Sequence, residues 1–92
     1  MTMQVTVHYM AQLRRAAGCA SERFDLASAL TVGTFLRFLA GRRLDTFRGL
    51  ILADADRVNN SLLVFIGDQP ADLGTLLRDG DVMTILTPMA GG

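Results

Sequence analysis

The residues of this sequence that could do chemistry stand at its end, where Met89 and Ala90 are followed by Gly91 and Gly92. At the average glycine usage of about 7%, two glycines at two given positions arise by chance about once in two hundred sequences. Pro88 stiffens the exit from the strand that we expect before it. The result is a slender strip that ends in a carboxylate, and such a strip can thread a narrow channel in another protein.

The chemistry open to this end of the chain is acyl activation at Gly92. A carboxylate is a poor acyl donor until ATP converts it into an acyl-adenylate, which sulfide or a thiol then attacks. The alternative is an unordered end of small residues without function, because chain termini are often poorly ordered. We predict that Gly92 is the reactive residue and that residues 88–92 form a flexible tail.

Composition limits the other kinds of chemistry. Nine basic residues balance nine acidic ones, so no strong field favours nucleic acid or a membrane surface as a partner. All nine basic residues are arginines, which leaves no lysine for a Schiff base or an isopeptide chain. The single cysteine, Cys19, excludes an internal disulfide and a multi-cysteine zinc site. We expect no metal and no bound cofactor.

Hydropathy argues for a cytoplasmic protein. The longest apolar run, residues 62–66, is much too short to span a bilayer. The first residues lack a basic segment followed by an apolar stretch, so we expect no signal peptide.

The elements that must position the tail follow from hydrophobic periodicity. Alternation predicts strands at 3–9 and 22–26, with a short helix at 11–17 between them that Gly18 ends. An apolar stripe with helical spacing predicts the main helix, which Thr31 begins as N-cap. The stripe consists of Val32, Phe35, Leu36 and Leu39, and Gly41, Arg42 and Arg43 suit its C-terminal end.

The middle of the chain is less regular. Between 44 and 60, the apolar residues from Phe47 to Leu52 indicate either one more helical turn or a short edge strand, before a polar loop. The run 62–66 predicts a strand that is covered on both faces or lies at the centre of a sheet. Gly67, Asp68 and Pro70 then predict a turn, and the leucines 73, 76 and 77 predict a single helical turn.

The last strand is predicted at 82–87, after a tight turn at Asp79-Gly80-Asp81. One face carries Met83 and Ile85, and the other carries Val82, Thr84 and Leu86. Because both faces are largely apolar, one packs inward and the other is either buried or kept for a partner. The order of elements predicts a single α+β domain over 1–92, with a mixed sheet packed on one main helix.

The run LRDGDVMTILTPMAGG, residues 77–92, resembles the C-terminus of the ThiS/MoaD family of sulfur carriers. Its pattern is a leucine, an Asp-Gly-Asp turn, an alternating strand, a proline and a terminal Gly-Gly. The front of the chain is similar to the MoaD branch, in which an Ala-x-Leu-Arg helix follows the first strand. The residues that carry this second likeness are Val5, Val7, Tyr9, Ala11, Leu13, Arg14 and Gly18.

The resemblance implies a ubiquitin-like β-grasp fold and a role for Gly92. In this family an E1-like activating enzyme uses ATP to adenylate the C-terminal glycine, which becomes a thiocarboxylate and passes its sulfur to an acceptor. In the MoaD branch the acceptor is the pterin precursor of molybdopterin, bound on a larger catalytic subunit of the synthase. The resemblance also implies partner binding by Leu86 and its face and by Pro88, Met89, Ala90 and Gly91. Such a protein is a carrier rather than a stand-alone enzyme.

Other functions stay open at this point. Related carriers serve thiamine, cysteine, tungsten-cofactor and tRNA-thiolation chemistry. Gly92 of a ubiquitin-like modifier would instead form isopeptide bonds with lysines of other proteins, and a plain β-grasp interaction domain would not use Gly92 at all. Cys19 is interpreted as an incidental loop cysteine, and His8 as a surface histidine without a second ligand nearby.

Overall fold

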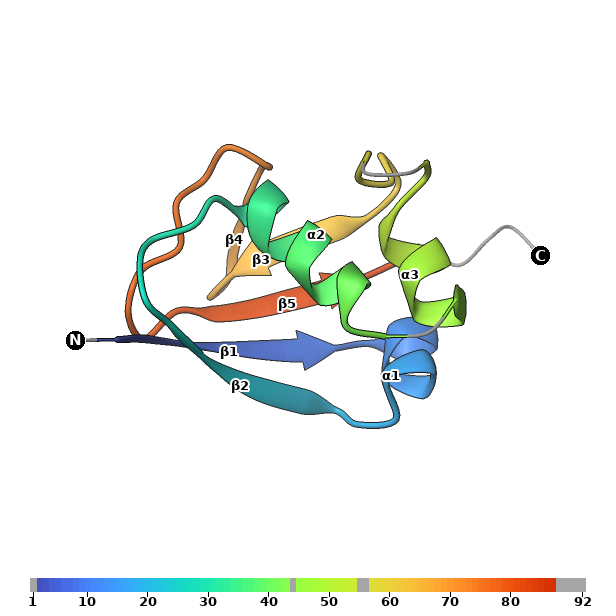
Figure 1. Ribbon diagram of the computed structural model, residues 1–92, viewed down its shortest axis with the longest axis horizontal. Coiled ribbons are helices and arrows are strands. Elements are labelled where there is room, and N and C mark those ends of the chain that lie inside the picture. The colour runs from blue at the N-terminus through green and yellow to red at the C-terminus, as the bar shows by residue number, and fades with distance from the viewer. Residues whose placement is uncertain (1, 44, 55–56, 88–92) are drawn as a thin grey trace.

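The computed structural model describes residues 2–43, 45–54 and 57–87 of the chain. A mixed five-stranded sheet forms one layer, and helices cover one of its faces (Figure 1). The elements are β1 Met3–Tyr9, α1 Ala11–Ala17, β2 Ser21–Leu26, α2 Val32–Gly41, α3 Asp45–Ile51, β3 Leu63–Ile66, β4 Gln69–Pro70 and β5 Val82–Leu86. The predicted α+β class, with a mixed sheet on one main helix, is confirmed.

The last strand in sequence lies at the centre of the sheet. The strand order is β2-β1-β5-β3-β4, so β5 joins the N-terminal pair of strands to the β3–β4 hairpin. It runs parallel to β1 and antiparallel to β3. Because β1 and β5 are parallel, both finish at the end of the sheet where α1 and α3 lie (Figure 1).

Local signals read from the sequence explain most of the helix boundaries. The hydroxyl of Thr31 accepts a hydrogen bond from the backbone N–H of Thr34 at 3.2 Å, as an N-cap does. Gly18 adopts φ +78° after α1, a left-handed conformation that glycine reaches without strain. The apolar segment after residue 44 forms α3 and not an edge strand, and a single bridge from Leu52 to Val58 follows it.

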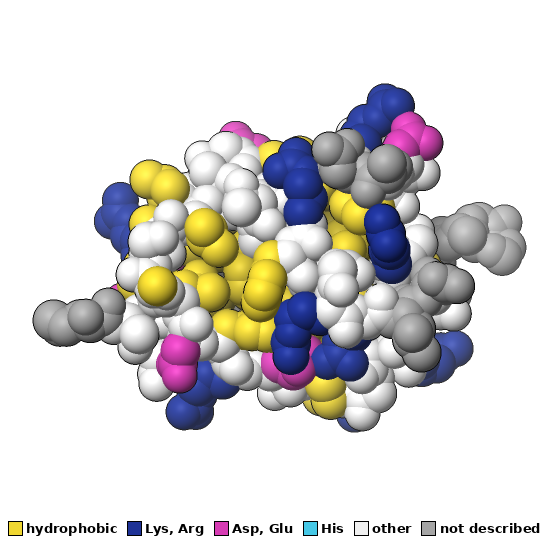
Figure 2. All heavy atoms as spheres, viewed as in Figure 1, with side chains coloured by type: hydrophobic (Ala, Val, Ile, Leu, Met, Phe, Trp, Pro, Cys, Tyr) yellow, Lys and Arg dark blue, Asp and Glu magenta, His cyan; other side chains and the backbone are white. Residues whose placement is uncertain are grey.

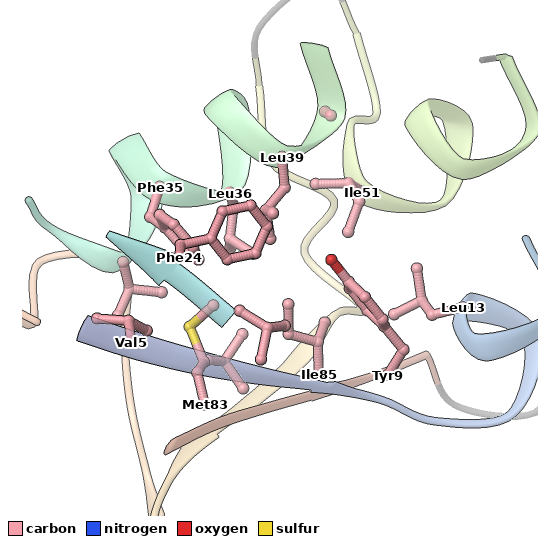
Figure 3. Packing of buried hydrophobic residues seen from close by; sticks show 14 of the residues in the cluster. Val5, Tyr9, Leu13, Phe24, Phe35, Leu36, Leu39, Ile51, Met83 and Ile85 are labelled. Carbon is pink, nitrogen blue, oxygen red and sulfur yellow. The ribbon is translucent and has the colours of Figure 1, made fainter. Parts of the chain in front are cut away.

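The core lies between the sheet and the helices. Figure 3 shows Phe24 and Phe35 together under α2, where their rings meet edge to face with centroids 5.4 Å apart. The fully buried side chains come from both layers. The largest are Tyr9, Phe35, Phe47, Leu13, Leu36, Leu39, Ile51, Leu77, Met83, Ile85, Val5 and Val7.

The helical turn predicted at the leucines 73, 76 and 77 is wrong. This segment contains a turn and then runs extended, and Leu76 forms a single bridge with Thr31. The reason lies at the start of α2, whose first N–H groups lack partners inside the helix. The carbonyl of Thr75 accepts from the N–H of Val32 at 2.8 Å, and that of Leu73 accepts from Gly33 at 2.9 Å.

The expectation that strand 62–66 is covered on both faces or lies at the sheet centre is also wrong. The strand starts at Leu63 and lies between β5 and the two-residue strand β4. Val64 points into the core, whereas the side chain of Leu63 is 45% exposed. Pro70, predicted in a turn, belongs to β4, where its missing N–H is tolerated because β4 is an edge strand.

No helix in the described ranges has both the length and the hydropathy needed to cross a membrane.

Candidate functional site

The turn before β5 fixes the start of the strand that leads to the tail. Gly80 has φ +87° and donates its N–H to the carbonyl of Gln4 at 2.8 Å. The carboxylate of Asp79 accepts the N–H of Gln4 at 2.7 Å. The carboxylate of Asp81 accepts the N–H of Arg78 at 2.8 Å. The predicted Asp-Gly-Asp turn is thus confirmed, and it pins the start of β5 to the start of β1.

The body of β5 is held on both sides by hydrogen-bonded strands. Val82 pairs with Thr6 of β1, and Ile85 pairs with Val64 of β3. Met83 and Ile85 point into the core and are completely buried. A strand with neighbours on both sides and two buried anchors gives the residues that follow it a rigid base.

The outward side of β5 forms an apolar strip with β3. Leu86 lies opposite Leu63, and Thr84 lies opposite Phe65. Val82 is 39% exposed. We call these five side chains the open face. The structure therefore places the half-buried Leu86 on the outward, largely apolar side of the strand, next to the point where the tail begins.

The last described residue, Thr87, holds the base of the tail against α1. Its side chain is buried, and its hydroxyl donates a hydrogen bond to Oε1 of Gln12 at 3.2 Å. The predicted site residues Pro88, Met89, Ala90, Gly91 and Gly92 lie outside the described residues. The structure thus brings together Leu86, the open face and the base of the tail.

A half-buried polar cluster lies at the same end of the molecule, and the sequence did not predict it. Arg43 binds the carboxylate of Glu22, and it also donates to the carbonyl of Ala17 at 2.8 Å. The hydroxyl of Tyr9 donates to Glu22 at 2.7 Å. The guanidinium of Arg43 also lies over the ring of Phe47, 5.4 Å from its centroid. In Figure 3 the Tyr9 oxygen points away from β1 toward the helical layer.

The charges of this cluster explain its shifted pKa values. Burial, followed by the hydrogen bond to Glu22, raises the pKa of Tyr9, so its hydroxyl stays a donor. Burial also acts to raise the pKa of Glu22, but the hydrogen bonds from Arg43 and Tyr9 and the nearby positive charges lower it overall. The cluster joins the end of α2 to β1 and β2. One signal in the sequence points to it: the tyrosine that ends an alternating strand needs a polar partner for its hydroxyl when buried.

Cys19 and His8 do not join a metal site in the described part of the chain, which holds no group of three or more side chains of the metal-binding kind. Cys19 is half-buried in the loop after α1, where its sulfur lies 4.0 Å from Arg43. His8 is exposed on β1.

Comparison with known proteins supports both the fold and the family. SAMP1 from Haloferax volcanii matches with a TM-score of 0.84 at 25% identity, over 97% of this chain and 99% of that one. The small archaeal modifier protein 1 from Methanosarcina acetivorans matches with a TM-score of 0.81 at 25% identity, over 100% and 99% of the two chains. A chain from the Amycolatopsis orientalis BexX/CysO complex matches with a TM-score of 0.65 at 25% identity, over 96% and 99%. No curated protein gives a match.

The fold is that of ubiquitin-like β-grasp proteins. The model of the ThiS family matches residues 7–92, so the chain belongs to that family. It is thus a member of a family of ubiquitin-like sulfur carriers or modifiers. The predicted fold class and family are confirmed.

Proposed function

We propose that the protein is a sulfur carrier whose Gly92 carboxylate is adenylated and then converted into a thiocarboxylate. The observation that carries the proposal is the placement of β5. This strand is central in the sheet and anchored at its start by the Asp79–Asp81 turn, and it leads directly into the Gly-Gly tail. A rigid base limits where the tail can go, which reduces the entropy lost when a partner binds it.

The chemistry requires little from the carrier beyond its carboxylate. In the first step an oxygen of Gly92 attacks the α-phosphate of ATP on an E1-like activating enzyme, and pyrophosphate leaves. In the second step sulfide attacks the acyl carbon, AMP leaves with the bonding electrons, and the product is the thiocarboxylate. Glycine at this position leaves the acyl carbon open to attack. ATP is then a substrate of the partner rather than a cofactor of this chain, and such a carrier would work in the cytoplasm.

The open face is the proposed docking surface for the activating enzyme and for the protein that receives the sulfur. Ordering a flexible residue costs about 1–2 kcal/mol, so the tail needs an anchor outside itself. The apolar strip formed by Val82, Leu86, Leu63 and their neighbours lies beside the base of the tail and can supply that anchor through burial.

The likeness of the front of the chain to the MoaD branch favours the pterin precursor of molybdopterin as the sulfur acceptor. The receiving partner would then be the larger catalytic subunit of a molybdopterin synthase. Supplying the thiocarboxylated protein to such a subunit with the precursor tests this step, and the expected result is molybdopterin formed in proportion to the sulfur consumed.

The carrier step itself is tested by intact mass spectrometry after incubation with ATP, an E1-like activating enzyme and a sulfur donor. We expect a mass increase equal to the replacement of one carboxylate oxygen by sulfur, and no increase when Gly92 is deleted. If an enzyme that activates its own carrier leaves this protein unchanged, the proposal fails for that pair. Partner binding that survives deletion of Gly92, without any sulfur transfer in the full chain, would favour a non-conjugating interaction domain.

A second function, protein modification, is favoured by the likeness to the small archaeal modifier proteins. Both functions share the acyl-adenylate and differ only in the nucleophile, which is sulfur in one case and a lysine amine in the other. The chain has no lysine, so it cannot extend itself into lysine-linked chains. A modifier would therefore leave single additions on other proteins, stable to reducing agents and absent when Gly92 is deleted.

A further inference from the structure

A groove between α1 and α3 lies at the end of the molecule where β5 finishes. Its volume is about 540 Å³. The floor is apolar, because Phe47 is buried and Ala16 and Leu50 are half-buried against the core. The residues that line the groove are Gln12, Arg15, Ala16, Thr46, Phe47 and Leu50.

The groove is linked to the base of the tail by a side-chain contact. Gln12, which lines the groove, accepts the hydrogen bond of Thr87. Five residues follow Thr87, and an extended chain spans at most about 3.3–3.6 Å per residue, or about 17 Å for these five. An enzyme that acts on Gly92 therefore has to approach the α1–α3 end of the molecule closely.

Helix α1 carries only positive charge, whereas α3 begins at Asp45. Helix α1 contains Arg14 and Arg15 and no acidic residue. Among the side chains that the structure describes, which do not include that of Asp45, no acidic one lies within ion-pair distance of either arginine. The segment 67–81, at the other end of β5, contains four aspartates and only one arginine. On the face drawn in Figure 2, most arginine side chains lie in the half that contains α1 and α3.

We propose that the α1–α3 groove binds an acidic segment of the protein that takes up the tail. One apolar side chain of that segment would fill the hollow over Phe47 and Leu50. Its carboxylates would pair with Arg15, which lines the groove, and with Arg14 on the adjoining surface of α1. The inference rests on the proposed function, because it assumes a partner that acts on Gly92. A small anion alone would leave the apolar floor unused, and a purely apolar peptide would leave the two arginines unpaired.

The groove and the open face make different demands on a partner. The open face is largely apolar, so it can bury the surface of a partner of either charge. Exposed arginines at the edge of an interface act mainly on the rate of encounter and on the choice of partner. The groove therefore selects which enzyme receives the tail, and the open face supplies much of the affinity.

The test replaces Arg14 and Arg15 by glutamate together and measures adenylation by an E1-like enzyme that is active on the wild-type protein. The control is Arg78→Glu, which makes the same kind of charge change at an exposed position just before the Asp79–Asp81 turn. We expect the double variant to raise the KM for the carrier by about tenfold at low salt with kcat unchanged, and the control to have little effect. Raising the salt concentration should increase the wild-type KM and leave the variant almost unchanged.

Any other result of this experiment would contradict the proposal, and each result would point to a different reason. Equal KM values for the double variant and Arg78→Glu would exclude the groove as a docking site. A lower KM in the double variant would indicate that the groove holds the chain's own tail, and a dimer lost in the variant would indicate a second copy. If no enzyme adenylates the wild-type protein, the proposed function fails together with this inference. If the enzyme adenylates the double variant as efficiently as the wild-type protein, this inference fails but the proposed function stands.

Discussion

The two sides of β5 carry similar side chains and have opposite surroundings. Met83 and Ile85 point inward and are completely buried, whereas Val82 and Leu86 point outward onto the open face. Burial of apolar surface contributes to stability in proportion to the area removed from water. The inward half of the strand therefore holds the fold together, and the outward half contributes little to stability until a partner covers it.

The largest effect on stability is expected from Ile85→Ala. Deleting most of a fully buried isoleucine removes packing and leaves a cavity, which lowers the free energy of unfolding by about 2–5 kcal/mol. The matched variant Leu86→Ala, one residue along the same strand, should lower it by less than about 1 kcal/mol. Urea denaturation of both variants measures the difference, and equal losses would show that the outward side of β5 is as important for the fold as the inward side.

The next effect concerns the polar cluster on the inward side. Arg43→Met keeps an apolar stem, but it removes the Arg43 donor from the Ala17 carbonyl and from the Glu22 carboxylate, which keeps only the hydrogen bond from Tyr9. We expect the free energy of unfolding to fall by about 1–3 kcal/mol. Arg42→Met is the control, because Arg42 is more exposed and its nitrogen lies 3.7 Å from Glu22. Such an exposed ion pair contributes about 0–1 kcal/mol to the free energy of unfolding.

A smaller effect is expected from acid. The pKa of Glu22 is lowered in the folded protein from its ordinary value of 4.5. The stabilisation from its ionised form is therefore complete above that value, and it is lost as the pH falls through the lowered pKa. Urea midpoints measured from about pH 6 down to about pH 3 should fall less steeply in Glu22→Gln than in the wild-type protein. Identical slopes would show that this carboxylate does not contribute to the acid sensitivity.

The smallest change in stability is expected from Leu86→Asp, which tests the outward side directly. The free energy of unfolding should change by less than about 1 kcal/mol, while affinity for the activating enzyme falls strongly because a charge enters the apolar strip. Ser21→Asp, exposed at the polar edge of the same sheet face, is the control and should bind as the wild type does. A stable Leu86→Asp variant with unchanged affinity would exclude the open face as the docking surface.

Periodicity predicted the elements in which local pattern and tertiary position agree. The alternation in β1 and β2 and the apolar stripe of α2 each match one buried face. The prediction for the apolar run 62–66 was wrong because the exposure of a strand depends on which elements cover its two faces. The sequence around Leu63 gives no sign that the outward face of this strand is left uncovered. The tail residues carried the clearest chemical signal. The Asp-Gly-Asp turn was predicted because the positive φ of Gly80 and the hydrogen bond between Arg78 and Asp81 are local features.

What the sequence did not predict depends on contacts between distant segments. The segment around Leu73 is shaped by the free N–H groups at the start of α2, about forty residues earlier in the chain. Arg43 and Glu22 are separated by 21 positions, and their pairing requires the chain to fold back on itself. The groove between α1 and α3 likewise exists only once these two helices are packed together.

The central position of β5 also has a consequence for the biogenesis of the protein. During synthesis β1 and β2 can pair early, and β3 can pair with β4, but the two halves of the sheet stay separate until the last strand is made. The β1–β5 pairing joins residues about 75 positions apart, and long-range pairings of this kind slow folding. A chain that lacks β5 cannot complete its sheet and should be removed as unfolded. Quality control in the cell would thus also ensure that every surviving copy carries the strand that leads to the Gly-Gly tail.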